Sequence, residues 1–399
     1  MSPSTRRTPQ VAVLLPSSVK VCRDMRRGIL RYVHQHGPWG LHILEGRDGE
    51  QKLFHMKEWG CTGIIGRPAT AEMQRIVQQA DIPVILMEDP KGDFLNKDHP
   101  LYQHSIVRSD TAAIGRMAAE YFKERKFQHF AFVGEINNLW WSVKRGKAFA
   151  QRLTDCGHHC HIYAGLPEAE QRDAGIEREH LCEWLSNLPK PIALLAAMDN
   201  RARQVIDACN WSDIAVPREI AVLGVDNDID LCENANPSMS SILLNAESVS
   251  YEAATHLDQM MKHNIRERRV FIYGPSHVVS RNSTAHVNLN NPLVSNALNY
   301  IRTNACSAIS VSDVVRHVHA SRRLTEMRFR EELEHSILEE IRKVRLENVC
   351  SLLRESDLSI GEITTQCGFE SNSYLGVLFR RTYGCTMRDY RNNKLGLQD

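Results

Sequence analysis

IGEITTQCGFESNSYLGVLFRRTYGCTM (360–387) decides the fold of the last quarter of this chain, and VSDVVRHVHASRRLTEMRFREELEHSI (311–337) repeats it weakly. Each stretch predicts a helix, a turn and a second helix, because apolar residues recur at three- and four-residue spacing on both sides of a polar break. A long helical pattern, SILEEIRKVRLENVCSLLRES (336–356), joins the two stretches. We predict a separate all-α domain over residues 292–395, built from two helix-turn-helix units.

Two helix-turn-helix units on one linking helix can place both second helices in successive major grooves of a DNA duplex, about 34 Å apart. Residues 321–330 contain four arginines and one acid, and residues 371–382 contain two arginines and no acid. The whole chain has a net charge of only +1, so any attraction for DNA belongs to these helices. One arginine-rich helix alone could be a solvated surface, whereas two tandem copies favour DNA binding.

The segment SIGEITTQCGFESNSYLGVLFRRTYG, followed by DYR, resembles the second half of an AraC-type DNA-binding domain. The resemblance covers about residues 292–393 and implies a sequence-specific regulator of transcription. His319 and Glu334 stand where this family usually carries glycine, whereas Gly368 and Gly384 retain it in the second unit. A non-glycine residue at a position of positive φ costs on the order of 1 kcal/mol, so we expect the first unit to be less rigid.

We expect the first turns of the two second helices to contact bases and their later arginines to contact phosphates. Thr325 is counted among the base contacts, although the family usually has a buried leucine there. Arg380 and Arg381 are expected to meet phosphates. The predicted DNA-binding residues are Ser321, Arg322, Arg323, Thr325, Arg328, Ser371, Asn372, Ser373, Tyr374, Arg380 and Arg381.

Residues 11–281 have a different sequence pattern, in which short apolar runs alternate with helical stretches. Continuous apolar runs are typical of parallel strands that helices cover on both faces. About 270 residues are too many for one open sheet of this kind, and the pattern breaks near 105–110 and near 236–242. We therefore predict an α/β, doubly wound fold with two lobes. The runs are VAVLLP, LHILE, TGIIG, IPVILME, FAFVGE, IALLAAMD and IAVLGVD.

Three segments, HVVSRNST (277–284), LGVDND (223–228) and SVKRGKAFAQRL (142–153), resemble LacI-type sugar sensors. This resemblance implies the type I periplasmic-binding-protein architecture, with two lobes and several chain crossings. The predicted boundaries are 10–285 for the sensor, with lobe one at about 10–108 and 243–267 and lobe two at about 109–242 and 268–285, and 286–291 for the linker.

A sugar needs polar groups for its hydroxyls and an aromatic face for its C–H surface. Asp199 and Asp226 each follow an apolar strand directly, at the sheet edge where such folds bind ligands. The LacI-type resemblance implies sugar contacts at Arg145 and Asp226. Asp199 could instead cap the following helix, and Arg145 could pair with a neighbouring acid. The predicted ligand-binding residues are Trp141, Arg145, Asp199, Asp226, Asn227 and Asp24.

A LacI-type sensor in front of an AraC-type domain resembles a bacterial family, the xylose operon regulators, and the likeness includes AAMDNRARQVIDAC (196–209) and NYIRTNACSAISV (299–311). It implies an activator of carbohydrate-utilisation genes, with a pentose such as xylose as the favoured effector. In the loop after the first strand, however, Pro16, Val21 and Cys22 replace the asparagine, tyrosine and aspartate of that family. Another sugar or a non-sugar metabolite is therefore the alternative effector.

Other protein classes receive little support. The apolar runs are far shorter than the roughly 18 to 20 residues of a membrane span, and no secretory signal is evident, so we expect a cytoplasmic protein without a membrane partner. Eleven cysteines, an odd number, predict reduced thiols. CGHHCH (156–161) lacks the spacing of a closed four-ligand zinc site and predicts a surface turn that a strand follows.

No phosphate loop and no nucleophile motif is present, so we expect no cofactor, no metal and no catalysis. An α/β enzyme whose C-terminal helices serve only for assembly is the rival interpretation, because doubly wound folds host many enzymes. The expected partners are double-stranded operator DNA, a sugar effector, RNA polymerase and a second copy of the chain in a homodimer.

Overall fold

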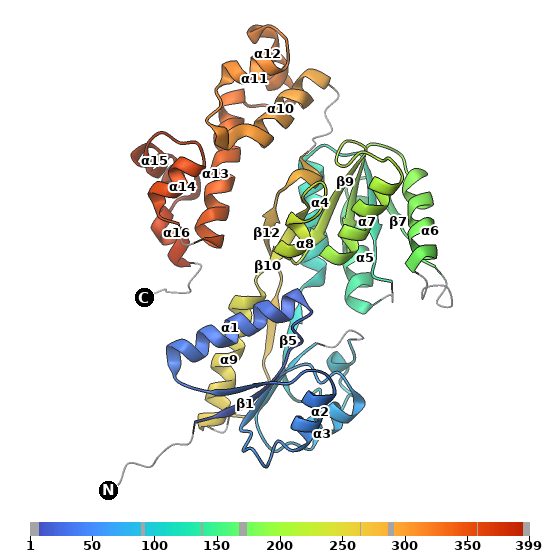
Figure 1. Ribbon diagram of the computed structural model, residues 1–399, viewed down its shortest axis with the longest axis vertical. Helices are drawn as coiled ribbons and strands as arrows, with labels where there is room; N and C mark the ends of the chain where they lie inside the picture. The colour runs from blue at the N-terminus through green and yellow to red at the C-terminus, as the bar shows by residue number, and fades with distance from the viewer. Residues whose placement is uncertain are drawn as a thin grey trace.

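The computed structural model describes residues 8–88, 92–136, 139–166, 174–263, 265–285, 291–356 and 358–393. Figure 1 shows two α/β lobes and a helical domain at the C-terminal end of the chain. Of the predicted linker 286–291, residues 286–290 lie outside the described residues. Within the described ranges, no helix is both long and apolar enough to cross a membrane.

Lobe one is a parallel six-stranded sheet in the order β11-β5-β4-β3-β1-β2. In β1, Val11 and Val13 belong to a core shared with α1 and α9, while Ala12 and Leu14 belong to a second core with α2 and α3. Both faces of the sheet are therefore covered, which explains the continuous apolar runs. The elements are β1 (Gln10–Leu14), α1 (Lys20–His36), β2 (Gly40–Ile43), α2 (Gly46–Phe54), β3 (Gly63–Gly66), α3 (Ala71–Gln78), β4 (Val84–Met87), η1 (Asp93–Leu95), β5 (Ser105–Ser109), α9 (Ala246–His263) and β11 (Val270–Tyr273).

Lobe two has a second six-stranded sheet in the order β12-β10-β9-β8-β6-β7, in which only the pairing of β10 with β12 is antiparallel. Its core includes Phe130 and Phe132 of β6 and Phe149 of α5. The elements are α4 (Thr111–Glu124), β6 (His129–Val133), α5 (Trp140–Thr154), β7 (Cys160–Ile162), α6 (Ala174–Ser186), β8 (Ile192–Ala196), α7 (Asp199–Trp211), β9 (Ile220–Val225), α8 (Ile229–Glu233), β10 (Ser240–Leu244), β12 (Pro275–Val279) and η2 (Asn282–Thr284).

The predicted two-lobed α/β fold is confirmed, and the chain crosses between the lobes after β5, after β10 and after β11. The first two crossings lie within a few residues of the predicted ones. The third prediction is wrong, because β11 pairs with β5 in lobe one although residues 268–285 were assigned to lobe two. Four residues, VFIY, are too short a run to show which sheet they join, and only tertiary pairing decides it.

The C-terminal domain is all-α, with two helix-turn-helix units joined by α13. Ser310, Ser336 and Ser359 each form a capping box with an acid three residues later, which satisfies the exposed N–H groups at three helix starts. Phe329 and Phe379 anchor separate cores, one for each unit. The elements are α10 (Pro292–Asn304), η3 (Ala305–Ser307), α11 (Val311–His317), α12 (Arg322–Leu333), α13 (Ile337–Glu355), α14 (Ile360–Gln366), α15 (Asn372–Tyr383) and α16 (Met387–Asn393).

The two residues that replace the expected glycines adopt the left-handed conformation. His319 has a φ of 51° and Glu334 a φ of 63°, close to the 74° and 75° of Gly368 and Gly384 in the second unit. The sequence prediction of positive φ at these positions is thereby confirmed. The first unit contains backbone strain that the second unit avoids.

Replacing Glu334 by glycine is expected to stabilise the helical domain by about 1 kcal/mol, because glycine adopts positive φ without a steric penalty. His319→Gly should act in the same direction. The measurement is thermal unfolding of the full chain followed by circular dichroism. Gly384→Ala is the reverse change at the corresponding position of the second unit and should lower the stability. A stabilising effect of Gly384→Ala would contradict the assignment of strain to positive φ.

Candidate effector site and DNA-binding helices

The loop after β9 contains a strained turn that presents the Asp226 carboxylate. Asp226 has a φ of 105° and Asn227 a φ of 51°, conformations that cost about 1 kcal/mol or more outside glycine. The Asp199 carboxylate holds this turn, since it accepts hydrogen bonds from the Asp228 backbone N–H at 2.7 Å and from Ser241 Oγ at 2.6 Å. Asp199 thus uses both oxygens within the protein, whereas the described residues provide no hydrogen bond to the Asp226 carboxylate.

Arg145 reaches the same place from α5. Its side chain is buried and donates to the Ala197 carbonyl, and its guanidinium lies 5.0 Å from the centre of the Trp141 ring. Its Nε is buried and has no hydrogen-bond partner among the described residues. Burial lowers the pKa of Arg145 and raises that of Asp226 to about 6, although each partly offsets the shift of the other. The structure therefore brings the predicted pair, Arg145 and Asp226, into electrostatic contact.

Lobe one contributes groups to this site that the sequence interpretation missed. Glu88 follows β4 and is only 4% exposed. Its Oε1 accepts from the Ser109 backbone N–H at 2.8 Å, while its Oε2 and the Ser109 Oγ are buried without partners among the described residues. Arg67 follows β3 and donates to the Glu88 carbonyl at 2.7 Å, and Tyr273 OH donates to Glu88 Oε1 at 3.5 Å. The rule that selected Asp226, a polar residue directly after a strand, would also have found Glu88 and Arg67.

The remaining predicted ligand residues have partners within the protein. Asp24 is buried and pairs with Lys20 at 2.5 Å and with Arg27 at 3.1 Å, all on α1. Asn227 Oδ1 accepts from Arg281 at 2.9 Å. The thiol of Cys22, on α1, is also buried and faces Met87 Sδ.

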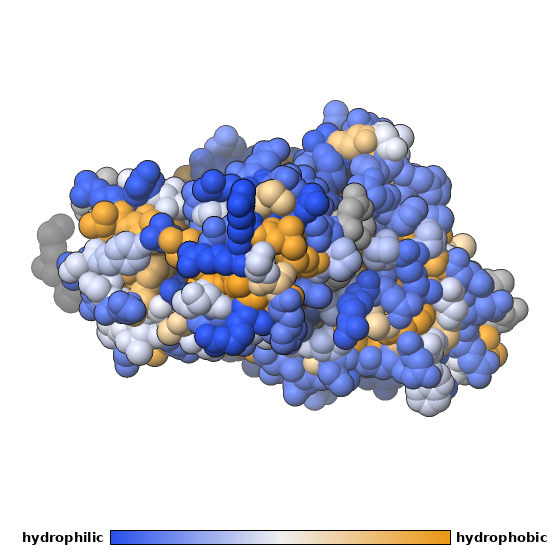
Figure 2. Space-filling model, turned by 90° about the horizontal axis from the view of Figure 1, so that it is seen from above, coloured by the Kyte–Doolittle hydropathy of each residue, from blue (hydrophilic) through white to orange (hydrophobic). Residues whose placement is uncertain are grey.

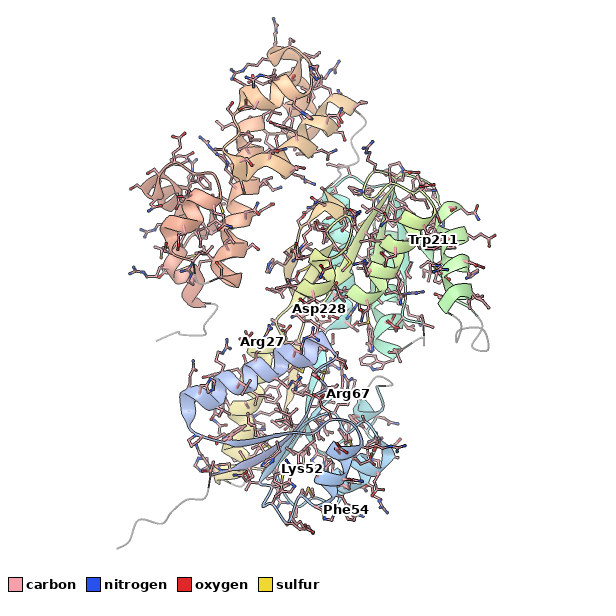
Figure 3. The ribbon with its side chains drawn as sticks, viewed as in Figure 1. Arg27, Lys52, Phe54, Arg67, Trp211 and Asp228 are labelled. Carbon is pink, nitrogen blue, oxygen red and sulfur yellow. The ribbon has the colours of Figure 1, made fainter. Side chains whose placement is uncertain are left out.

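An ion pair bridges the two lobes beside this site. Arg23 of α1 donates to the Asp228 carboxylate at 2.5 Å. Figure 3 labels Asp228 on the edge of lobe two that faces lobe one, and Arg67 on lobe one. The unpartnered groups of Glu88, Ser109, Arg145 and Asp226 thus gather where the carboxyl ends of strands from both lobes meet.

Buried Glu88 makes the stability of the unliganded protein depend on pH. Burial raises its pKa to about 7 despite the nearby Arg67, Arg108 and Arg145, compared with an ordinary value near 4.5. The pKa of Glu88 in the folded state lies above its value in the unfolded state. Its contribution to the free energy of unfolding is therefore fully present below about pH 4.5 and is lost as the pH rises through 7. We expect a loss of up to about 3 kcal/mol between these limits. Chemical unfolding at pH 5 and pH 8 measures it.

Glu88→Gln should remove the part of this pH dependence that Glu88 contributes and raise the stability at pH 8. Glu58→Gln, at a side chain that is 75% exposed, is the control and should leave the profile unchanged. Equal profiles for wild type and Glu88→Gln would show that another group titrates.

The predicted DNA-binding residues lie on the second helices of the two units, α12 and α15. Ser321 and Ser371 are the N-caps of these helices and accept hydrogen bonds from the backbone N–H groups of Leu324 and Tyr374. Thr325 is wrong as a base contact, because its side chain is 0% exposed and its hydroxyl donates to the Ser321 carbonyl. Thr325 belongs to the core instead. The other ten candidates are exposed: Ser321, Arg322, Arg323, Arg328, Ser371, Asn372, Ser373, Tyr374, Arg380 and Arg381.

The two helices differ in free positive charge. On α12, Arg322 pairs with Glu326 and Arg328 pairs with Glu331, both at 2.9 Å. In the described part of the chain, Arg380 and Arg381 of α15 form no ion pair within 4 Å. Figure 2 views the molecule from above, from the end at which α12 lies, and shows a mostly hydrophilic surface interrupted by apolar patches. The α15 arginines are therefore more available to phosphates than Arg322 and Arg328 of α12.

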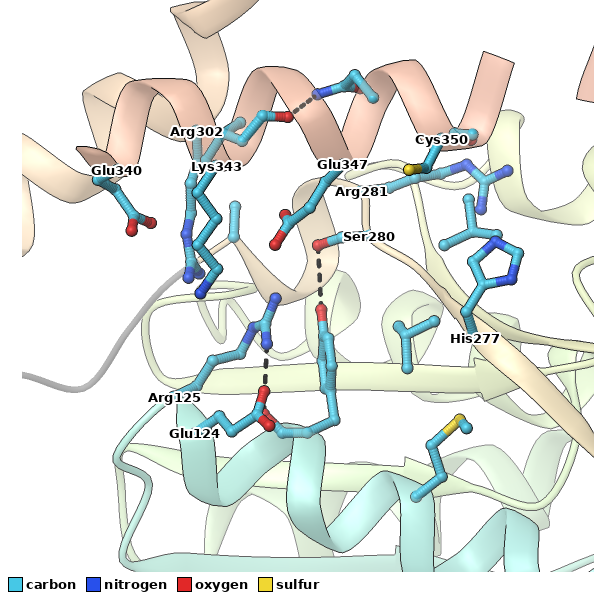
Figure 4. Close-up of a pocket in the computed structure, with 18 of the residues that line it drawn as sticks. Glu124, Arg125, His277, Ser280, Arg281, Arg302, Glu340, Lys343, Glu347 and Cys350 are labelled. Atoms are coloured by element: carbon cyan, nitrogen blue, oxygen red, sulfur yellow. Dashed lines mark hydrogen bonds between the residues drawn. The ribbon is translucent and has the colours of Figure 1, made fainter. Parts of the chain in front are cut away.

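A polar seam joins lobe two to the helical domain. A cavity of about 530 Å³ lies there between α4 and β12 on one side and α10 and α13 on the other (Figure 4). Tyr121 OH hydrogen-bonds Thr284 at 2.6 Å and Ser280 at 3.0 Å, and the Arg125 guanidinium lies 3.5 Å from the centre of the Tyr121 ring. Arg302 of α10 faces these groups, and burial lowers its pKa to about 10. The helical domain thus contacts lobe two through polar and charged side chains.

Two family models match the chain in the order predicted from the sequence. Residues 119–284 match the periplasmic binding protein-like domain, and residues 314–393 match a helix-turn-helix domain. The predicted CGHHCH turn is followed by a strand, β7, and the described residues contain no cluster of three potential metal ligands. The two matched domains correspond to the sensor, in part, and to the helical domain.

Similar proteins extend this comparison to nearly the whole chain. The xylose operon regulatory protein of Haemophilus influenzae is 28% identical over 391 residues, which cover 96% of this chain and 98% of that one. The solved structure of the xylose-binding transcription activator xylR matches with a TM-score of 0.62 at 27% identity, covering 97% of this chain and 98% of that chain. A LacI family regulator from Enterococcus faecium with bound ribose covers 69% of this chain and 98% of its own, at a TM-score of 0.54 and 17% identity, which shows the sensor fold alone.

Proposed function

We propose that the chain is an AraC-type transcription regulator whose helix-turn-helix domain follows a periplasmic-binding-like sensor, and that a sugar bound between its lobes controls its binding to operator DNA. The names of its relatives favour a pentose such as xylose and an activating role. In this proposal the protein acts as a homodimer on paired half-sites and contacts RNA polymerase.

One observation carries the proposal: unpartnered polar groups from both lobes face one another. Three buried atoms have no partner among the described residues: Glu88 Oε2 can accept a hydrogen bond, Arg145 Nε can donate one, and Ser109 Oγ can do either. The Asp226 carboxylate adds a further acceptor. Buried polar groups without partners cost free energy, so a ligand that satisfies them binds with a corresponding gain. A neutral polyhydroxyl compound suits this set, because each hydroxyl both donates and accepts.

A change in lobe arrangement caused by ligand binding can be transmitted to the DNA-binding helices through rigid elements. The effector would contact Asp226 on lobe two and Glu88 on lobe one, and the Arg23–Asp228 ion pair already joins the lobes at this edge. A change in the angle between the lobes would move α4 and β12, which form one wall of the polar seam against α10 and α13. The sugar shifts the population of DNA-binding arrangements only if it binds one lobe arrangement better than another.

Thermal unfolding of the full chain with pentoses, hexoses and sugar acids tests the sensor. A ligand that binds only the folded state stabilises it by about 2.7 kcal/mol at a concentration of 100 Kd. We expect a selective shift from one sugar or a few related ones. A shift from a non-sugar metabolite and from no sugar would overturn the sugar proposal. The buried thiol of Cys22 on α1, which faces Met87, is the observation that favours this second candidate.

Arg381→Ala is expected to weaken DNA binding by a similar factor for all sequences and to lower the salt slope of log K by about 0.9, the value for one lost phosphate contact. Arg380→Ala should behave alike. Fluorescence anisotropy with two different duplexes at several salt concentrations measures both effects. Arg316→Ala is the control, since this arginine lies on α11 and pairs with Asp313. If Arg380→Ala changed sequence preference but not the salt slope, its assignment to phosphates would be wrong.

A further inference from the structure

Two cysteines from different halves of the helical domain lie close together. Cys306 lies in η3, before the first helix-turn-helix unit, and Cys367 ends α14 in the second unit. A hydrogen-bonding interaction between the two thiols lowers the pKa of Cys306 and raises that of Cys367. Cys306 also packs against the apolar core that contains Cys367, although 61 positions separate the two residues in the chain (367 − 306 = 61).

The backbone fixes this contact. Gly368, with a φ of 74°, lies so close to η3 that a Cβ on it would be 2.8 Å from the Cys306 carbonyl oxygen. Arg345 of α13 donates to the Ala305 carbonyl at 2.7 Å and to the Ile309 carbonyl at 3.0 Å, which ties η3 to the linking helix on both sides of Cys306. These contacts hold the two backbone segments together and so keep the two cysteines close to each other.

The two sulfurs differ in reactivity and access. The hydrogen-bonding interaction with Cys367, together with the nearby Arg345 cation, lowers the pKa of Cys306 to about 7, so much of it is thiolate at neutral pH. Cys306 is partly exposed, whereas Cys367 is fully buried and its pKa is raised. An oxidant from solution therefore meets the Cys306 thiolate, which is the reactive form of cysteine.

We propose that Cys306 and Cys367 form a peroxide-sensitive thiol pair, which oxidation converts into a disulfide that joins the two halves of the DNA-binding domain. The Cys306 thiolate attacks one oxygen of a hydroperoxide, the O–O bond breaks, and Cys306 becomes a sulfenic acid while an alkoxide or hydroxide leaves. The Cys367 sulfur then attacks the Cys306 sulfur, the S–O bond breaks, and the Cys367 proton and the hydroxyl leave as water. The peroxide gains the two electrons that the two thiols lose.

The disulfide would change the position of α15. An S–S bond is about 2.05 Å long, much shorter than a non-bonded contact between two sulfurs, so η3 and the turn after α14 must shift relative to each other when it forms. This turn, at Gly368, leads directly into α15, on which the exposed residues Asn372, Ser373 and Arg380 lie. We expect the cross-linked protein to bind DNA about tenfold more weakly, a change of about 1.4 kcal/mol.

The first test is chemical. Reduced full-length protein is treated with hydrogen peroxide, unfolded, and analysed by thiol titration and by mass spectrometry of non-reduced peptides. We expect two of the eleven thiols to disappear, leaving nine, and the Cys306–Cys367 peptide pair to account for the loss. A Cys350–Cys367 link, cross-linked dimers or the survival of all eleven thiols would overturn the proposal. Cys306→Ser, at the partly exposed position, should prevent the loss, and Cys156→Ser in the sensor is the control that should not.

The second test measures DNA binding by anisotropy, with a duplex that the reduced protein selects from a random library. Peroxide should weaken binding by wild type and by Cys156→Ser about tenfold, dithiothreitol should restore it, and Cys306→Ser should not respond. An unchanged affinity of the cross-linked protein would overturn control of DNA binding by this pair. Failure of the reduced protein to select any duplex would instead count against the proposed DNA-binding function, so the two failures are distinguishable.

Discussion

Asp226→Asn is expected to lower the affinity for the effector by between tenfold and a hundredfold, because a hydrogen bond to a charged acceptor contributes about 1.5 to 3 kcal/mol. The amide keeps the shape of the side chain but replaces one accepting oxygen by a donor that faces Arg145. The measurement is the concentration dependence of the thermal shift with whichever ligand stabilises wild type. Asp230→Asn, on an exposed part of α8, is the matched control and should keep full affinity.

The same substitution should stabilise the unliganded protein at pH 8. Burial raises the pKa of Asp226 to about 6 from an ordinary value of 3.8, so its ionised form is disfavoured in the folded state. A raised folded pKa means that stability is lost as the pH rises through 6, and asparagine removes that loss, a gain of about 1 to 3 kcal/mol. Weaker binding together with higher stability would indicate that Asp226 is held in a strained, ionised state for its ligand. Unchanged affinity would show that the effector does not use this carboxylate.

Phe379→Ala is expected to destabilise the second helix-turn-helix unit by about 3 to 5 kcal/mol, as is typical when a buried aromatic ring is removed. Phe379 is 0% exposed and contacts the rings of Tyr383 and Tyr390 with centroid distances of 4.7 and 5.3 Å. A unit of this size has little stability in reserve, so α15 should lose its fixed position and DNA binding should fall below detection. Circular dichroism and DNA anisotropy on the full chain test both effects.

Two further alanine variants test whether the effect is specific to Phe379. Phe329→Ala removes the corresponding ring from the first unit, where it is also 0% exposed, and shows whether the units unfold independently. Val377→Ala, at a side chain on α15 that is 71% exposed, should leave the stability nearly unchanged. A loss below about 1 kcal/mol for Phe379→Ala would contradict its role as the anchor of α15. Ligand-induced stabilisation of the sensor should persist in all three variants, because its core is separate.

Local patterns in the sequence determined the elements and their order. Continuous apolar runs predicted seven of the strands, because a strand covered on both faces needs no polar alternation. The repeated helical spacing predicted α11, α12, α14 and α15, and the missing glycines predicted positive φ at His319 and Glu334. Such features depend on neighbours within about four residues, so the sequence contains them directly.

The sequence also contained a signal for the error at Thr325. Thr325 and Phe329 are four residues apart on α12 and therefore share a face, just as the buried Leu375 and Phe379 do on α15. Its place in the first turn of α12 suggested a base contact at Thr325, whereas helical periodicity places it in the core. Here the geometry of the helix outweighs the chemical suitability of the side chain.

Only the tertiary structure decided which groups meet. Glu88, Ser109 and Arg67 come from the ends of three strands of lobe one, and Asp226 comes from lobe two, so no spacing in the sequence relates them. The contact between Cys306 and Cys367, and the assignment of β11 to lobe one, depend in the same way on pairings between distant segments. Whether a polar side chain stays free or is used internally, as in Asp199, depends on partners that long-range packing supplies. The sequence by itself thus determined the elements and both domains, and the packing of remote strands and helices determined the sites, because hydrogen bonds and burial act through space and not along the chain.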